Sequence, residues 1–212
     1  MKTLKELTSE YRKKRVKIKK RLKEFREVWH KSERRIFSEL CFCICTPQSK
    51  AFFCDAAISR LSKNGKLFSG NLGKIRRDLG GVRFPNNKAK YILEARKLFL
   101  NNGRFKIKEK INQKDILKTR HWFVKNVKGL GLKEASHFLR NIGFGRDLAI
   151  LDVHIIRNIL KYGVINKRPK TLTEKKYLSL ERKLRKFAEN VNIPMDELDL
   201  LFWSSETGEI FK

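Results

Sequence analysis

The stretch VKGLGLKEAS, residues 127–136, joins two helix-forming runs through two glycines that lie two residues apart. Gly129 and Gly131 permit a positive φ and let the backbone approach another surface closely. The N–H groups at the start of the helix that follows can then bind an anion. Plain turns between helices also use glycine often. The stretch therefore predicts a helix–hairpin–helix. Which anion it would bind is inferred from the rest of the chain.

Helical periodicity extends from this hairpin over almost the whole chain. Helices are predicted at 113–126 and 133–142 on either side of it, and a long amphipathic helix is predicted from Leu4 to Trp29. Strand-like alternation is almost absent. The sequence thus predicts an all-α protein of about ten helices.

Two helix starts are marked by local residue chemistry. Thr46 followed by Pro47 predicts an N-cap with proline at the first position of a helix that runs to residue 62. Thr171 with Glu174 predicts a capping box for a helix that runs to about residue 190.

The charge balance points to a polyanionic partner. Lys and Arg number 51 against 22 Asp and Glu, which gives a formal net charge of +29. Nucleic acid is the leading candidate because Lys and Arg displace counterions from phosphates, and an anionic membrane surface is the alternative. No apolar run approaches the roughly 18 residues of a membrane-spanning helix, and the N-terminus lacks the apolar core of a signal peptide. We therefore expect a soluble, cytoplasmic protein without a membrane partner.

The four cysteines are predicted to be structural. Cys41, Cys43 and Cys45 stand in RIFSELCFCICTPQ, which reads as a buried helix, and Cys54 follows nine residues later. Cysteine is among the residues most often buried. A metal site is the alternative, but the spacing differs from known zinc and iron–sulfur patterns.

Lys133 and Asp152, 19 residues apart, form a pair that phosphate binding does not require. A neutral lysine amine can attack the anomeric carbon of a sugar and form a Schiff base. A carboxylate can orient that amine, assist proton transfer and stabilise positive charge on the sugar. Spacing alone leaves a structural alternative open, in which Lys133 lies beside a phosphate and Asp152 is the N-cap of VHIIRNIL.

VKGLGLKEAS with AILDVHI resembles the helix–hairpin–helix and downstream aspartate signature of the DNA base-excision glycosylase superfamily. Within it, FSELCFCICTPQSK, GVRFPNNKAKYI and LDLLFWSSETGEIFK are similar to the archaeal-type 8-oxoguanine DNA glycosylases. The resemblance covers most of the chain, and the joint match is specific. A hairpin alone is weak, since ligases, helicases and polymerases carry one too.

The resemblance implies roles for individual residues. Lys133 matches the lysine that marks bifunctional glycosylase/lyases, and Asp152 matches the assisting carboxylate. Gln48, in TPQS, takes the place where related enzymes insert a polar side chain into the gap left by an extruded base, or is a first-turn surface residue. The phosphate-binding hairpin falls on Lys128, Gly129, Leu130, Gly131 and Leu132.

Recognition of the flipped base is implied at the end of the chain. Trp203 would stack on the base, and Lys212 would contribute its terminal carboxylate. Without the resemblance, Trp203 reads as a core residue and Lys212 as a frayed tail. Phe84, with Asn86 in RFPNN, is a further candidate for the same cleft.

Departures from related patterns restrict the assignment. Iron–sulfur members carry four cysteines near the C-terminus, whereas no cysteine follows Cys54 here. We therefore expect no iron–sulfur cluster, no metal held by side chains and no cofactor, although related hairpins can hold a monovalent cation on backbone carbonyls. The expected partner is duplex DNA containing oxidised guanine, bound by a monomer.

Superfamily members fold as two helical subdomains with DNA crossing the cleft between them. Residues 36–148 would form a helical barrel that contains the hairpin, and residues 1–35 would join 149–212 in the second subdomain. The activity implied is excision of 8-oxoguanine by Lys133, followed by β-elimination that nicks the strand, on a nucleotide flipped out of the helix.

Two rival functions remain. A non-catalytic helix–hairpin–helix DNA-binding protein explains the charge and the glycines, but not the combination of Lys133, Asp152 and the aromatic tail. The other rival is a basic RNA-binding protein, but the sequence shows no recognisable RNA-binding module.

Overall fold

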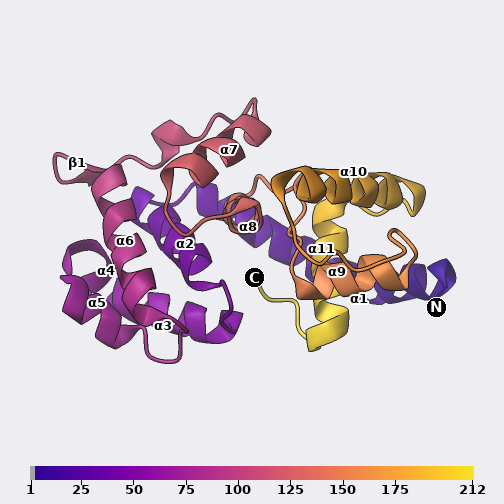
Figure 1. Ribbon diagram of the computed structural model, residues 1–212, viewed down its shortest axis with the longest axis horizontal. Helices are drawn as coiled ribbons and strands as arrows, with labels where there is room; N and C mark the ends of the chain where they lie inside the picture. Colours follow the sequence, from indigo (N-terminus) through magenta and orange to yellow (C-terminus); the bar gives the residue numbers. More distant parts are fainter. Residues whose placement is uncertain (1–2) are drawn as a thin grey trace. The chain divides into compact units, whose positions relative to one another are not determined.

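The structure is a computed structural model that describes residues 3–212, and its regular secondary structure is almost entirely helical (Figure 1). Within these residues, eleven α-helices, one 3-10 helix and two short strands follow one another. The first part contains α1 (Leu4–Trp29), α2 (Glu33–Cys45), α3 (Ala51–Lys63), α4 (Lys66–Ser69), α5 (Leu72–Asp78) and α6 (Pro85–Phe99). The remainder contains β1 (Leu100–Asn101), β2 (Arg104–Phe105), the 3-10 helix Lys108–Lys110, α7 (Ile116–Asn126), α8 (Leu132–Asn141), α9 (Val153–Lys161), α10 (Glu174–Asn190) and α11 (Met195–Thr207). The all-α prediction is confirmed; β1 and β2 pair as a single antiparallel hairpin.

The chain divides into two compact units. The first consists of Met1–Glu27 with Leu139–Lys212, and the second of Val28–Phe138. The sequence placed the divisions at 35/36 and 148/149, so each observed division falls within a helix, α1 or α8, rather than in a connection. Residues 1 and 2, with which the predicted second subdomain begins, lie outside the described residues.

The first unit brings the start of the chain together with its last helices. Along α1, Leu7, Ile18 and Leu22 are at most 5% exposed, as the helical periodicity predicted, whereas Leu4 is 53% exposed. Tyr11 donates a 2.7 Å hydrogen bond to Oε2 of Glu197 on α11. This hydrogen bond links α11 to α1, although the two residues lie 186 positions apart in the chain.

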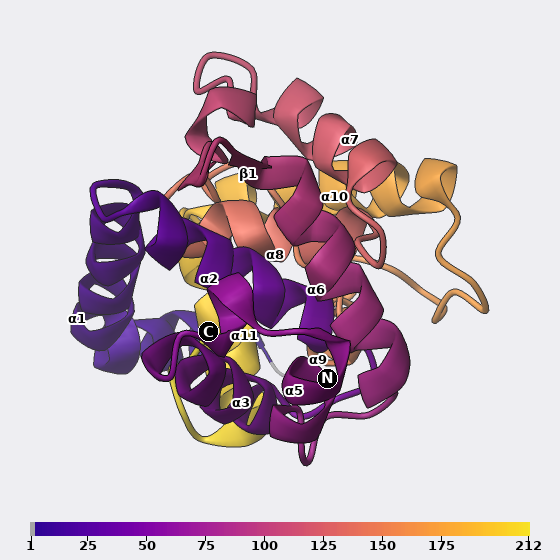
Figure 2. The ribbon, with the colours of Figure 1, turned by 90° about the vertical axis from the view of Figure 1, so that its left-hand side faces the viewer.

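The second unit is built around α2, which is buried along ten consecutive residues, Ile36–Cys45. Helices α3 and α6 pack on it, and Figure 2 shows α2 between them. Phe37, Phe99, Phe123 and Phe138 are each at most 1% exposed and bring α2, α6, α7 and α8 to one aromatic core. The helix–hairpin–helix is therefore anchored in this core by both of its helices.

The four cysteines lie inside this unit as free thiols, which confirms the predicted burial. Burial raises the pKa of the Cys54 thiol to about 11, so it stays protonated near neutral pH. Its Sγ donates to the carbonyl oxygen of Cys45 over 3.2 Å. These thiols serve packing between α2 and α3.

Two predicted helix starts are wrong in detail. Thr46 is the C-cap of α2, not an N-cap, and α3 begins only at Ala51 after a loop, Thr46–Lys50, that contains Pro47. The helix predicted from Thr171 begins two residues later, because the side chain of Thr173 accepts the hydrogen bond from Lys176 N. Near residue 171 two threonines offer the same capping chemistry, and Thr173 makes the cap, whereas Lys50, the N-cap residue of α3, makes no side-chain cap hydrogen bond.

Within residues 3–212, no helix is long and apolar enough to cross a bilayer.

Candidate active site

The hairpin between α7 and α8 is held against Tyr91 of α6. Gly129 has a φ of +88°, and a Cβ at this position would lie 2.5 Å from Cδ2 of Tyr91. Glycine is required here both for its backbone conformation and for the close approach. Leu130 and Leu132 are buried, at 6% and 9% exposure, so these two residues can offer DNA only their backbone.

Lys128 is the exposed side chain of the hairpin. Its Nζ lies 6.0 Å from the centre of the Tyr91 ring and 3.7 Å from Oε1 of Glu94. Both groups of the pair with Glu94 are at least half exposed, so the ion pair contributes little to stability and leaves Lys128 able to approach a phosphate.

Lys133 lies in the first turn of α8, with its side chain 24% exposed. Its Nζ is 3.1 Å from Oε1 of Glu134, while Oε2 of Glu134 accepts a 3.1 Å hydrogen bond from the N–H of Gly131. One carboxylate therefore spans the lysine and the second glycine of the hairpin. A phosphate that reaches the Gly131 N–H has to displace this carboxylate.

Asp152 belongs to the first unit and is the N-cap of α9. Its Oδ1 accepts hydrogen bonds from the N–H groups of His154 and Ile155, at 2.9 and 2.8 Å. The capping role considered from the sequence is confirmed. Both bonds use Oδ1, so capping does not occupy Oδ2, and the half-buried carboxylate keeps an oxygen for other chemistry.

Asp199 of α11 shares the electrostatic environment of Asp152. Desolvation raises the pKa of Asp199 to about 7; the nearby charge of Arg140 opposes the rise, and that of Asp152 adds to it. Oδ2 of Asp199 lies 3.9 Å from a guanidinium nitrogen of Arg140. The sequence offered no signal for this group, because Asp199 stands in an apolar run that reads as an ordinary core helix.

Gln48 and Phe84 lie on two loops of the second unit. Both have a φ of +56°, which side-chain-bearing residues seldom adopt. Gln48 is exposed in the Thr46–Lys50 loop, and Phe84, 50% exposed, is the N-cap residue of α6. The N–H of Arg83 donates to Oγ of Ser49 over 3.0 Å, so the two loops are directly joined.

Trp203 and the end of the chain lie together in the first unit. The Trp203 ring packs on that of Phe211 at 6.3 Å and meets the ring of His154 edge-on, also at 6.3 Å. Nε of Arg21 donates to the carbonyl oxygen of Phe211 over 2.9 Å, which ties the tail to α1 next to the half-buried Lys212. Trp203 is only partly buried, so its ring is not enclosed in the core.

The structure thus gathers the candidate residues into two groups, one in each unit. Lys133, Lys128, the hairpin, Gln48 and Phe84 belong to the second unit; Asp152, Trp203 and Lys212 belong to the first. Sequence reasoning overlooked Glu134, although its position three residues after Gly131 is a capping-box spacing. Within residues 3–212, no group of three or more His, Cys, Asp or Glu side chains could hold a metal ion.

Known proteins are similar to this chain over most of its length. Residues 18–193 match the model of a family described as 8-oxoguanine DNA glycosylase. A relative from Fusobacterium nucleatum subsp. nucleatum, named 8-oxoguanine DNA glycosylase/AP lyase, is 48% identical over 197 residues, covering 92% of this chain and 91% of the relative. A relative of the same name from Methanocaldococcus jannaschii is 40% identical over 208 residues, with coverage of 92% and 91%.

Two crystal structures also match over almost the full chain. The 8-oxoguanine DNA glycosylase of Thermotoga maritima gives a TM-score of 0.87 at 35% identity, covering 99% of this chain and 98% of the other. The Methanocaldococcus jannaschii 8-oxoguanine glycosylase/lyase, in complex with DNA containing 8-oxoguanine, gives a TM-score of 0.86 at 34% identity and covers 99% of both chains.

Proposed function

This chain belongs to the 8-oxoguanine DNA glycosylase family, and we propose that it excises 8-oxoguanine from duplex DNA and then cleaves the strand at the abasic site. The observation that carries the proposal is the place of Lys133, half-buried in the first turn of α8 directly after the hairpin. The matched family region contains the hairpin, Lys133 and Asp152 together. Relatives over most of the chain bear names that include both activities.

Lys133 is the nucleophile in this mechanism. Its neutral amine bonds to C1′ of the flipped nucleotide while the N-glycosidic bond breaks, and the base leaves with the bonding electrons and takes up a proton. Opening of the sugar ring gives a Schiff base on Nζ. Removal of a 2′ proton then expels the 3′ phosphate, which nicks the strand. These steps need neither oxidant nor reductant, so we propose that the reaction uses no cofactor.

Asp152 assists the attack. As a carboxylate it can accept the proton that the amine must lose, and it stabilises positive charge that develops on the sugar. The α9 backbone fixes its orientation through Oδ1, so the group is held in place before substrate arrives. The cap and the catalytic role are compatible because they use different oxygens.

The hairpin binds the DNA backbone. Lys128 supplies an exposed cation, and the exposed Gly129 offers its backbone to a phosphate. Buried Leu130 and Leu132 anchor the hairpin rather than touch DNA with their side chains. Backbone carbonyls of the hairpin offer ligands for a monovalent cation.

Base recognition falls to the aromatic residues outside the hairpin. Trp203, supported by Phe211, and half-exposed Phe84 offer ring faces on which a flipped purine can stack. Lys212, half-buried beside Phe211, is a further candidate for contact with the base. Gln48 would fill the gap in the duplex. The protein acts on duplex DNA as a monomer.

A lesion panel tests the function. Wild-type protein is incubated with duplexes that carry 8-oxoguanine, guanine or an abasic site at one position, and strands are separated without alkali. We expect cleavage at 8-oxoguanine and at the abasic site, but none at guanine.

Two variants separate an enzyme from a DNA-binding protein. Lys133→Gln should lose cleavage while DNA binding is largely kept, and Lys128→Gln, which removes an equal charge on the same hairpin, should weaken binding but keep cleavage at saturating protein. Wild type that binds the 8-oxoguanine duplex without cleaving it would instead support the non-catalytic rival.

A further inference from the structure

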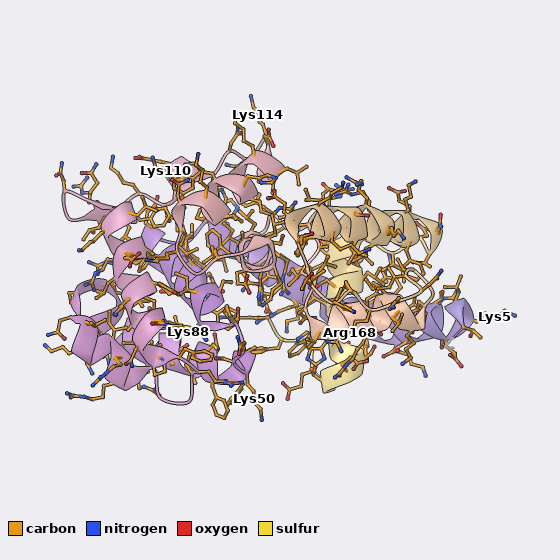
Figure 3. All side chains as sticks on the ribbon, viewed as in Figure 1. Lys5, Lys50, Lys88, Lys110, Lys114 and Arg168 are labelled. Atoms are coloured by element: carbon orange, nitrogen blue, oxygen red, sulfur yellow. The ribbon has the colours of Figure 1, made fainter. Side chains whose placement is uncertain are left out.

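Lys88 is the only buried lysine within residues 3–212. Figure 3 labels six basic residues, of which Lys5, Lys50, Lys110, Lys114 and Arg168 are exposed, whereas Lys88 of α6 is only 4% exposed. Burying an ammonium group is costly unless hydrogen bonds replace its water. The partners of Lys88 therefore indicate what its burial achieves.

The three hydrogen bonds of the Lys88 ammonium reach Cys45, the last residue of α2, and two residues of the loop Thr46–Lys50 that follows it. Its Nζ donates to the carbonyl oxygens of Cys45 and Pro47, at 2.6 and 2.8 Å, and to Oγ of Ser49 at 2.9 Å. An ammonium group has three N–H donors, so these bonds use its full capacity. The Cys45 carbonyl is also at the C-terminal end of α2, where a positive charge is favourable.

The loop that Lys88 holds carries Gln48. Pro47 and Ser49, the residues on either side of Gln48, are both acceptors of the Lys88 ammonium. Gln48 has a φ of +56°, and a left-handed backbone costs a side-chain-bearing residue roughly 1–2 kcal/mol. Such a conformation persists only where its surroundings enforce it. The ammonium of Lys88 supplies that constraint.

The same network reaches Phe84. Oγ of Ser49 accepts a second hydrogen bond, from the backbone N–H of Arg83. The backbone N–H of Lys88 donates to the carbonyl oxygen of Phe84 over 3.1 Å. Phe84 has the same left-handed φ as Gln48. Two strained turns from different parts of the second unit are thus joined through Lys88 and Ser49.

Lys88 also lies within the electrostatic reach of the nucleophile. Desolvation lowers the pKa of Lys88, and the charges of Lys133 and Arg83 lower it further. The loop network therefore belongs to the neighbourhood of Lys133.

We propose that Lys88 is a positioning residue that locks the Gln48 loop and the Phe84 turn into one rigid element, which enters the damaged duplex as a unit. This role rests on the proposed function. Gln48 supplies a polar side chain for the gap left by the flipped base, and Phe84 supplies an aromatic face. A rigid pair avoids the entropy of ordering two separate loops when DNA binds.

The test compares excision with cleavage of a preformed abasic site, which requires no base to be extruded or stacked. Lys88→Met keeps the side-chain length without the three donors, and Lys97→Met removes a charge from an exposed position on the same helix. We expect Lys88→Met to slow single-turnover excision of 8-oxoguanine on the order of 10- to 100-fold, while abasic-site cleavage stays near the wild-type rate. Lys97→Met should match wild type in both reactions.

A second reporter follows the flipping step itself. With 2-aminopurine next to the lesion, wild type should raise the fluorescence as the base leaves the stack, and Lys88→Met should raise it less. Ser49→Ala removes the acceptor that joins the two loops and should give the same selective loss, so it decides the question if Lys88→Met does not fold.

Three results would overturn the proposal. Excision by Lys88→Met at the wild-type rate contradicts it, and so does a parallel fall of excision and abasic-site cleavage, which indicates general loss of structure. For Ser49→Ala, unchanged excision is likewise contradictory. If wild type itself excises nothing, the proposed function fails and this role falls with it, whereas an active wild type with an active Lys88→Met overturns only the role of Lys88.

Discussion

Lys133 is one of 51 basic residues, and its residue type alone says nothing about its role. Its surroundings distinguish it. Whereas most of the positive charge is exposed, Lys133 is half-buried at a helix start and is held 3.1 Å from Glu134. The capping-box position of Glu134 could have been predicted from the sequence; its contact with Nζ could not, because that depends on side-chain direction in the first turn of α8.

Asp152 allows its two roles to be separated by substitution. Asparagine caps helices as well as aspartate does, whereas alanine loses the cap at a cost of about 0.5–2 kcal/mol. Asp152→Asn should therefore keep the free energy of unfolding near that of wild type but lose most excision activity. Asp152→Ala should lose both. Urea denaturation and single-turnover excision are the two measurements.

A matched control comes from another helix. Thr173→Ala removes the N-cap of α10, so it should lower stability without lowering the excision rate. If Asp152→Asn excises 8-oxoguanine as fast as wild type, Asp152 is only a cap.

Asp199 gives a pH dependence of stability. Its pKa is raised from 3.8 to about 7 in the folded state, chiefly by burial. The folded protein therefore binds this proton more tightly than the unfolded chain does. Protonated Asp199 therefore contributes to the free energy of unfolding. This contribution is fully present below about pH 4 and is lost as pH rises to about 7, by an amount on the order of 4 kcal/mol.

Asp199→Asn should flatten this part of the profile. Urea denaturation at about pH 5 and about pH 8 should show a smaller fall in stability for the variant than for wild type. Identical falls in the two proteins would show that the ionised carboxylate is not disfavoured in the fold.

At the scale of elements, the hairpin is constrained at Gly129. Gly129→Ala meets two costs, the left-handed φ of +88° and a contact 2.5 Å from Tyr91. Gly103→Ala meets only the first, because Gly103 has a φ of +75° with no atom within 4 Å of the added Cβ. Gly103→Ala should cost about 1–2 kcal/mol, and Gly129→Ala clearly more. Gly129→Ala should also weaken DNA binding.

Urea denaturation and fluorescence titration with duplex DNA measure the two effects. Equal destabilisation by the two substitutions would mean that Tyr91 moves away freely. Unchanged DNA binding by a folded Gly129→Ala would mean that the hairpin backbone does not touch DNA.

The elements themselves were largely predictable where one signal dominates. The 3.6-residue periodicity of α1 and the cap of α9 at Asp152 are both present in the structure. Prediction failed at Thr46–Pro47, where the residues suit a helix start but instead end α2 and open a loop. The reason is tertiary, since Lys88 holds that loop from 39 to 43 residues away in sequence, and no local pattern reveals such a bond.

At the scale of the whole molecule, a net charge of +29 should make DNA binding steeply salt-dependent. A protein with about six to ten phosphate contacts loses roughly 10³- to 10⁵-fold in affinity between about 50 and 200 mM salt. We expect a loss in this range for undamaged duplex, measured by fluorescence anisotropy. Single-turnover excision at saturating protein should change far less. A nearly flat plot of log affinity against log salt would contradict binding through phosphates.

Charge and family resemblance thus predicted a DNA partner and the fold class, whereas the two compact units divide at other positions than the predicted ones. Both observed divisions fall inside continuous helices, α1 and α8. A helix interior carries no change of composition at which a boundary could be recognised. The proposed nucleophile and its carboxylate belong to different units, so their pairing has to be tested by chemistry.

The central claim is that Lys133 forms a covalent bond to the sugar of the damaged nucleotide. Borohydride is added to wild-type protein reacting with an 8-oxoguanine duplex, the reduced complex is digested, and mass spectrometry identifies the peptide that carries the nucleotide. The adduct is predicted on Lys133 and should be absent from Lys133→Gln. An adduct on Lys88, Lys128 or any other amine, or equal trapping by Lys133→Gln, would contradict the claim.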